Sequence, residues 1–174
     1  MVPPEEQLAS SLNQTRKSLI AELITTIKQC DPYFFERLVV QLLLKMGYGG
    51  SRQEAGEAIG KSGDGGIDGV ISEDRLGLDA MYLQAKRWEG SVGEGPICDF
   101  KGALDAKGVR KEVFITTGSF FFAATAAAKN SRSYKIVLID GQRLVDLIIE
   151  HDLGVSVAAT YNVKRIDSDF FADE

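Results

Sequence analysis

The sequence predicts an α/β protein with a mixed central sheet flanked by helices. Stretches of alternating or continuous apolar residues, each short enough for a strand, are interspersed with amphipathic stretches at helical spacing. A short polar turn joins the first two strands, which favours an antiparallel hairpin, and helices separate the later strands, which favours parallel neighbours. The 174 residues, 44% of them hydrophobic, suit one domain with a sizeable core.

The first part of the chain predicts two helices. Residues from Glu5 to about Lys28 are amphipathic and follow a short tail. Asp31 provides an N-cap and is followed by proline at the first helical position, so a second helix should run from Pro32 to about Met46. Residues 48–66 are rich in glycine and polar side chains, which predicts a loop or an irregular edge strand.

The middle of the chain predicts the hairpin. One strand spans residues 67–71 and the other spans residues 79–87, with a polar turn between them. Side chains alternate along the second strand, so Tyr82, Gln84 and Lys86 share one of its two faces.

The remaining chain alternates helices and strands. We predict a helix over 96–107, a strand over 111–117, a helix over 119–130, a strand over 135–139, a helix over 142–151 and a final strand over 155–165. The strand over 135–139 is apolar enough to be buried on both faces. The phenylalanines Phe120–Phe122 stand near a predicted helix start and are more typical of a core or an interface than of a catalytic site. An exposed patch there would suggest oligomerisation.

The composition argues against several functional classes. A net charge of −5 gives the chain no general attraction to nucleic acid, although lysine and arginine gather in its second half. Cys30 and Cys98 are far apart and form no disulfide framework, which fits a cytoplasmic setting. The one histidine, His151, makes a zinc site or a histidine-dependent triad a poor explanation. We find neither a secretory signal nor an apolar run long enough to cross a membrane.

Asp68 lies within the first strand of the hairpin, where a buried carboxylate is costly unless it meets a cation or several donors. If the hairpin pairs in its natural register, Asp68 faces Gln84 and Lys86 on the next strand. Such a group can hold Mg²⁺ through Asp68, the backbone carbonyl of Ala85 and waters. Lys86 can then position or deprotonate an attacking water. Spacing alone also allows a simpler interpretation, an Asp68–Lys86 salt bridge on an exposed sheet face.

Five sequence blocks occur in one order: FERLVVQLLLKMGYGG, SGDGGIDGVI, YLQAKRW, VFITT and IVLIDGQRL. Over residues 17–168 the chain thereby resembles the catalytic domain of Mrr-type restriction endonucleases, within the PD-(D/E)xK nuclease superfamily. The resemblance implies a restriction-endonuclease-like α-β-β-β-α-β core. It also implies Mg²⁺-dependent hydrolysis of phosphodiester bonds in double-stranded DNA, with Mn²⁺ as a substitute ion. The biological role implied is type IV-like restriction of modified (methylated) DNA.

By this resemblance, Asp68 is the metal-binding aspartate and Lys86 is the catalytic lysine. Gln84 holds the place of the second acidic residue. Glu36 matches a helix glutamate that points into the site as a ligand of the metal or of water. Asp64 is a secondary candidate, either as a helper ligand or as a turn residue. The cationic residues expected to contact DNA are Lys86, Arg87 and Lys101.

The chain departs from the superfamily pattern at two positions. Gln84 replaces an acidic residue, and Ile67 replaces a proline. Glutamine is usual at this place in the Mrr-like branch, so the resemblance still implies an active site. The missing negative charge implies weaker metal binding, which Glu36 would offset.

The resemblance also suggests how the chain is organised. Residues 1–16 are expected to be a tail or the remnant of a linker to an N-terminal winged-helix recognition domain. Residues 17–168 form the nuclease domain, and residues 169–174 form an acidic tail. Cutting both DNA strands needs two active sites, so we expect a homodimer or a higher assembly. Two alternatives stay open: a non-catalytic nucleic-acid-binding or assembly module on the same fold, and a junction-resolving nuclease.

Overall fold

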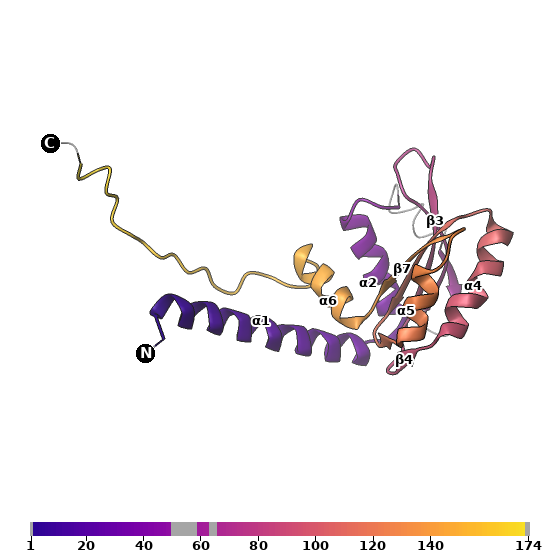
Figure 1. Ribbon diagram of the computed structural model, residues 1–174, viewed down its shortest axis with the longest axis horizontal. Helices are drawn as coiled ribbons and strands as arrows, with labels where there is room; N and C mark the ends of the chain where they lie inside the picture. Colours follow the sequence, from indigo (N-terminus) through magenta and orange to yellow (C-terminus); the bar gives the residue numbers. More distant parts are fainter. Residues whose placement is uncertain (1, 50–58, 63–65, 173–174) are drawn as a thin grey trace.

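The computed structural model describes residues 2–49, 59–62 and 66–172. Within this part, a five-stranded sheet is packed between helices (Figure 1). The helices are α1 (Pro4–Gln29), α2 (Pro32–Lys45), α4 (Glu94–Lys107), α5 (Phe122–Lys129) and α6 (Gly141–Glu150). The strands are β1 (Ile59–Ser62), β2 (Gly66–Ser72), β3 (Ala80–Lys86), β4 (Ser91–Val92), β5 (Lys111–Thr116), β6 (Ser119–Phe120) and β7 (Lys135–Ile139).

The main sheet is mixed, as the sequence predicts. Its strand order is β1-β2-β3-β5-β7, with antiparallel pairing between β1 and β2 and between β2 and β3. The pairs β3–β5 and β5–β7 are parallel because helix α4 and then helix α5 connect them. Strand β1 falls in the glycine-rich stretch and lies at one edge of the sheet, in agreement with the expected irregular edge strand.

A separate hydrophobic core covers each face of the sheet. On one face, α2 and α6 pack through residues such as Phe35 and Ile148 against Leu83 of β3. On the other face, α4 and α5 pack against Tyr82 and Phe114. Because side chains alternate along a strand, β3 contributes to both cores and is buried along its middle five residues. The central strand therefore sits in a fixed register, since a slip by one residue would exchange its two faces.

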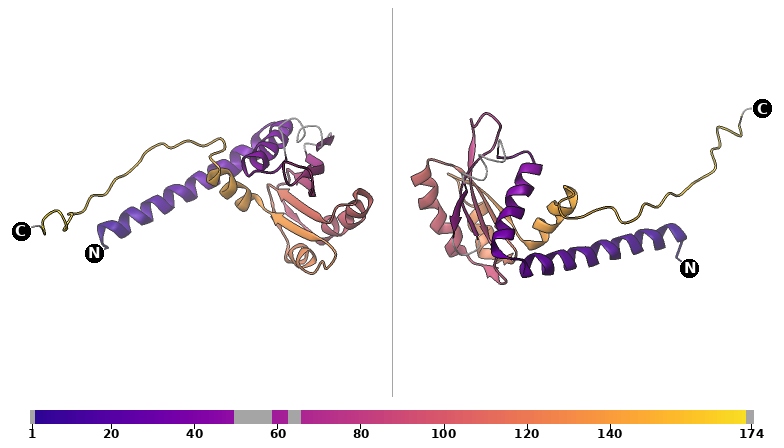
Figure 2. Two further views of the ribbon diagram at one scale, coloured as in Figure 1. Left: turned by 90° about the horizontal axis from the view of Figure 1, so that it is seen from above. Right: turned by 180° about the vertical axis from the view of Figure 1, so that it is seen from behind.

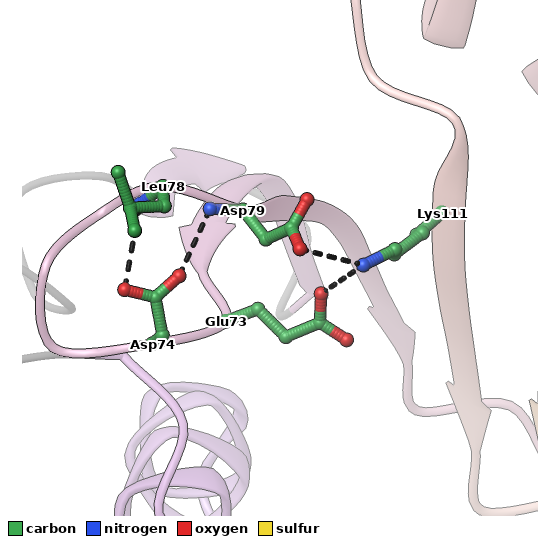
Figure 3. Close-up of polar contacts among 5 residues, drawn as sticks. All are labelled: Glu73, Asp74, Leu78, Asp79 and Lys111. Carbon is green, nitrogen blue, oxygen red and sulfur yellow. Dashed lines mark hydrogen bonds and ion pairs between the residues drawn. The ribbon is translucent and has the colours of Figure 1, made fainter.

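The turn between β2 and β3 is fixed by its own polar groups (Figure 3). The Asp74 carboxylate accepts hydrogen bonds from the backbone N–H groups of Leu76 at 2.7 Å, Leu78 at 3.4 Å and Asp79 at 2.9 Å. These bonds, that from Asp79 foremost, hold the pKa of Asp74 below its ordinary value. Lys111 of β5 contacts Glu73 and, at 3.3 Å, Asp79. Its pKa is raised, chiefly by the hydrogen bond to Glu73.

Helix α1 extends well beyond the sheet (Figures 1 and 2). Ile20, Ile24 and Ile27 pack into the core on the α6 side, and Arg16 pairs with Asp146 of α6 at 2.9 Å. The first turns of this helix are exposed. Helix α1 confirms the helix predicted from Glu5 to about Lys28, and it includes most of residues 1–16. No described helix is both long enough and apolar enough to span a membrane.

Two strand predictions are corrected by the structure. Residues 155–165, predicted to be a final strand, form no regular secondary structure, and Val157, Tyr161 and Val163 are exposed. The pattern alternates as a strand does, but a strand also needs a hydrogen-bonded neighbour, and the segment runs away from the sheet (Figure 1). Strand β7, predicted to be buried on both faces, forms the edge of the sheet and leaves Val137 41% exposed.

The phenylalanine run is divided between core and surface. The helix predicted from Ser119 begins at Phe122, because Ser119 and Phe120 instead pair with β4 in a short parallel ladder. Phe120 packs edge-on against Phe114, with ring centroids 5.6 Å apart. Phe121 and Phe122 are 59% and 88% exposed.

Candidate functional site

The hairpin register brings three of the predicted site residues together. Asp68 on β2 pairs directly with Gln84 on β3, and Gly66 pairs with Lys86. Paired residues point to the same face of an antiparallel ladder, as do residues two apart on one strand. Asp68, Gln84 and Lys86 therefore share one face of the sheet. They lie towards the end of the hairpin opposite its turn.

The burial of these residues differs sharply. Asp68 is exposed, Lys86 is half-buried and Gln84 is only 7% exposed. The side-chain oxygen Oε1 of Gln84 accepts no hydrogen bond from any described residue. A buried oxygen without a donor costs about 1–3 kcal/mol, so this oxygen is suited to a donor or ligand from outside the described residues. This face is therefore open to solvent at Asp68 and closed at Gln84.

Glu36 approaches from a different layer. It lies in the first turns of α2, whose start is fixed by Asp31, because the Asp31 carboxylate accepts a hydrogen bond from the N–H of Tyr33 at 2.9 Å. The Glu36 oxygen Oε1 is buried. Helix α2 packs on the face opposite Lys86, so the register that unites the three hairpin residues does not by itself include Glu36.

The other predicted site residues are only partly described. Ala85 is buried near the end of β3 and is paired with Ile67 of β2. Lys101 belongs to α4. Asp64 lies outside the described residues.

Arg87 has contacts that sequence reasoning did not anticipate. Its guanidinium nitrogen Nη1 donates to the backbone carbonyl of Lys28 at 3.3 Å and to that of Cys30. Both carbonyls lie at the end of α1, where a helix leaves acceptors without partners inside the helix. A pattern of residues along the chain gives no indication of this contact, because the partners are 57 and 59 residues away.

The sequence also gave no indication that Glu112 is a buried carboxylate. It lies on β5 beside Tyr82, is 1% exposed, and neither carboxylate oxygen has a hydrogen-bond partner among the described residues. Burial raises the pKa of Glu112 to about 7. In the sequence the residue sits in an unremarkable strand, KEVFITT, and burial could be known only once the strand order placed β5 inside the sheet.

The oxygen atoms near Asp68 are of the chemical types that bind a hard divalent cation. Carboxylate, amide and backbone carbonyl oxygens are the ligands that such ions prefer. Among the described residues, however, no three side chains of histidine, cysteine, aspartate or glutamate come together as a metal-binding group. A cation at this place would therefore draw on the amide of Gln84 or on backbone and water oxygens beside the carboxylate of Asp68.

Comparison with known proteins supplies the family. Residues 27–148, well over half of the chain, match the catalytic-domain family described as restriction endonuclease, of the Mrr type. The chain belongs to this family. Restriction endonucleases of this family are typically metal-dependent. The match includes Glu36, Asp68, Gln84 and Lys86 within its span.

A curated relative agrees with the family assignment. The chain is 40% identical over 168 residues to the type IV methyl-directed restriction enzyme EcoKMrr of Escherichia coli strain K12. The aligned region covers 97% of this chain and 54% of that enzyme, so the chain spans about half the length of its relative. The α/β fold and the homology to a type IV restriction endonuclease, both expected from the sequence, are confirmed.

Proposed function

We propose that this chain is a metal-dependent endonuclease domain that hydrolyses phosphodiester bonds in double-stranded DNA. The observation that carries the proposal is the pairing of Asp68 with Gln84, with Lys86 on the same face, in a chain of the restriction endonuclease family. A carboxylate, an amide oxygen and an amine on one face supply a cation ligand set and a group that can handle a proton.

Each residue has a chemical role in this proposal. Asp68, the backbone carbonyl of Ala85 and the amide of Gln84 would hold a Mg²⁺ ion, or Mn²⁺ in its place, and Glu36 of α2 would be a further ligand. A bound Mg²⁺ supplies Lewis-acid stabilisation of charge on the phosphoryl oxygens. Lys86 orients or deprotonates the attacking water and stabilises negative charge that develops on the phosphate. The buried Gln84 oxygen provides a neutral ligand or orients a water.

Nicking of a supercoiled plasmid tests this proposal. Cleavage should require Mg²⁺ and stop when EDTA removes it. Asp68→Ala and Lys86→Ala should each reduce cleavage by at least about 100-fold, the scale expected when one catalytic electrostatic group is lost. Lys135→Ala is a matched control, because Lys135 is an exposed lysine on the edge strand β7. Unchanged cleavage by either site variant would overturn the residue assignment.

We further propose that the DNA is modified foreign DNA. The support is the relative, which is named a methyl-directed restriction enzyme. Parallel assays on methylated and unmethylated plasmid test this point. Equal cleavage of both would mean that these residues carry the chemistry without the discrimination, which an N-terminal winged-helix domain would then provide. Assays on branched DNA test the junction-resolving alternative.

Double-strand cutting by this domain would involve two copies of the chain. Each copy contributes one site in this proposal, so a homodimer or a higher assembly cuts both strands. Light scattering during gel filtration, with and without DNA, measures the number of copies. A monomer that linearises plasmid without passing through a nicked form would contradict this arrangement.

A further inference from the structure

Arg87 links two parts of the candidate site that come from different layers. It directly follows Lys86, the last residue of β3. Its Nη1 atom donates to the carbonyls of Lys28 and Cys30, which flank the end of α1. A cation at a helix C-terminus satisfies carbonyls that have no partner within the helix and is favoured by the helix dipole.

The contacted backbone leads directly into α2. Helix α1 ends at Gln29, Asp31 caps the next helix, and α2 begins at Pro32. Glu36 follows one turn later, so little chain separates it from the carbonyl that Arg87 holds. Figure 1 shows this junction of α1 and α2 beside the end of the sheet near β4.

We propose that Arg87 is a positioning residue that sets Glu36 relative to Asp68 and Lys86. The need for such a link follows from the architecture, because α2 covers the face of the sheet opposite Lys86. The inference rests on the proposed nuclease function. It replaces the sequence-based expectation that Arg87 contacts DNA, because its Nη1 atom is held by two backbone carbonyls and the side chain is partly buried.

A guanidinium suits this task better than an amine. Arginine presents several N–H donors in a planar, rigid arrangement, so one side chain can hold two carbonyls in fixed positions. Lysine at this position would keep the positive charge but lose the fixed geometry. A displacement of a catalytic ligand by about 1 Å is enough to cost about 100-fold in rate.

The test separates positioning from DNA contact. In saturating Mg²⁺, Arg87→Gln should lower kcat by at least about tenfold and leave KM for DNA unchanged, because ligand placement affects the chemical step. Arg87→Lys should lie between this variant and the wild type. Arg132→Gln, a change at an exposed arginine, is the matched control and should alter neither constant. A raised KM with an unchanged kcat would overturn the proposal in favour of DNA contact.

A double-mutant cycle tests whether the effect passes through Glu36. If Arg87 acts by placing Glu36, Arg87→Gln should cost little further activity in a Glu36→Gln background. Losses that multiply independently would overturn the proposed link. Circular dichroism melting of each variant shows that the fold is retained, and Arg87→Lys provides the comparison if Arg87→Gln does not fold.

The affinity of the isolated protein for Mn²⁺, measured by electron paramagnetic resonance, is independent of cleavage. Arg87→Gln should weaken Mn²⁺ binding, and an unchanged affinity would overturn the positioning role. A wild-type protein that binds Mn²⁺ but cuts no DNA would instead contradict the proposed nuclease function.

Discussion

The two ends of the β2–β3 hairpin differ in whether their polar side chains find partners within the protein. At the turn, Asp74 accepts three backbone hydrogen bonds. Figure 3 shows those from Leu78 and Asp79, and the contacts of Lys111 with Glu73 and Asp79. At the other end, Asp68 is exposed and the buried Gln84 oxygen receives no hydrogen bond from the described residues. Polar groups that satisfy one another stabilise the fold, whereas the buried oxygen beside Asp68 is left without a donor among the described residues.

Glu112 shows that a buried group without a partner is not sufficient to mark a site. Its carboxylate also has no partner among the described residues, but it is enclosed by the core that contains Tyr82 and Phe114. Asp68 and Gln84 differ in that one exposed carboxylate stands directly opposite a buried oxygen. The distinction between a stability cost and a ligand site therefore lies in access to solvent and in the neighbouring donors.

The largest expected effect is on catalysis at the end of the hairpin distant from the turn. Lys86→Met should reduce Mg²⁺-dependent nicking by at least about 100-fold, because it removes the cationic group beside Asp68 and keeps a side chain of similar length. Lys111→Met is the same change at the turn end and should leave nicking close to the wild-type rate. If Lys111→Met stayed folded and lost as much activity as Lys86→Met, the contrast between the two ends would be wrong.

The second effect concerns Glu112 and the pH dependence of stability. Its folded pKa of about 7 lies above the ordinary value of 4.5, because burial disfavours the carboxylate. Its contribution to stability is fully present below pH 4.5 and is lost as the pH rises through about 7. The shift corresponds to about 3 kcal/mol at most.

Glu112→Gln removes this titration. The free energy of unfolding of the variant, relative to the wild type, should therefore rise by up to about 3 kcal/mol between pH 4 and pH 8. Urea titrations at the two pH values measure the difference. A difference that does not change with pH would show that Glu112 gains a partner or water on ionisation.

The sequence predicted those features of the structure that depend on residues close together in the chain. The hairpin, the Asp31 cap and the pairing of Asp68 with Gln84 follow from alternation and turn residues close together in the chain. The failed strand over 155–165 shows the limit, since alternation states which side chains share a face and not whether another strand is adjacent.

The features that the sequence did not predict depend on long-range packing. Arg87 contacts carbonyls 57 and 59 residues away, and Glu112 is buried because β5 lies inside the sheet and a helix-covered core encloses this face of it. Neither fact is encoded in nearby residues. The roles of Asp68, Gln84, Lys86 and Glu36 came from a family resemblance and stay predictions until they are tested by substitution.

A third, smaller effect concerns the Mg²⁺ requirement and tests whether Gln84 lies beside the ion. Gln84→Glu adds a negative charge directly opposite Asp68 and should lower the Mg²⁺ concentration for half-maximal nicking, by roughly tenfold, because affinity for such ions rises with ligand charge. Without metal, the same variant should be less stable than the wild type, since two neighbouring carboxylates would then repel each other. A Mg²⁺ titration and melting in EDTA measure the two effects. A higher Mg²⁺ requirement would argue against an ion beside this residue.

The smallest expected effect is at the turn. Asp74→Asn keeps the size of the side chain but removes the negative charge of the carboxylate that accepts hydrogen bonds from Leu76, Leu78 and Asp79. Hydrogen bonds to a charged acceptor are stronger, so the melting temperature at pH 7 should fall slightly. Because the folded pKa of Asp74 is lowered from 3.8, its stabilisation is present above that value and is lost as the pH falls through the lower folded pKa. The difference in melting temperature between variant and wild type should therefore shrink on acidification. Nicking activity should stay unchanged, and a loss of nicking with the fold intact would mean that the turn contributes to the site as well as to the fold.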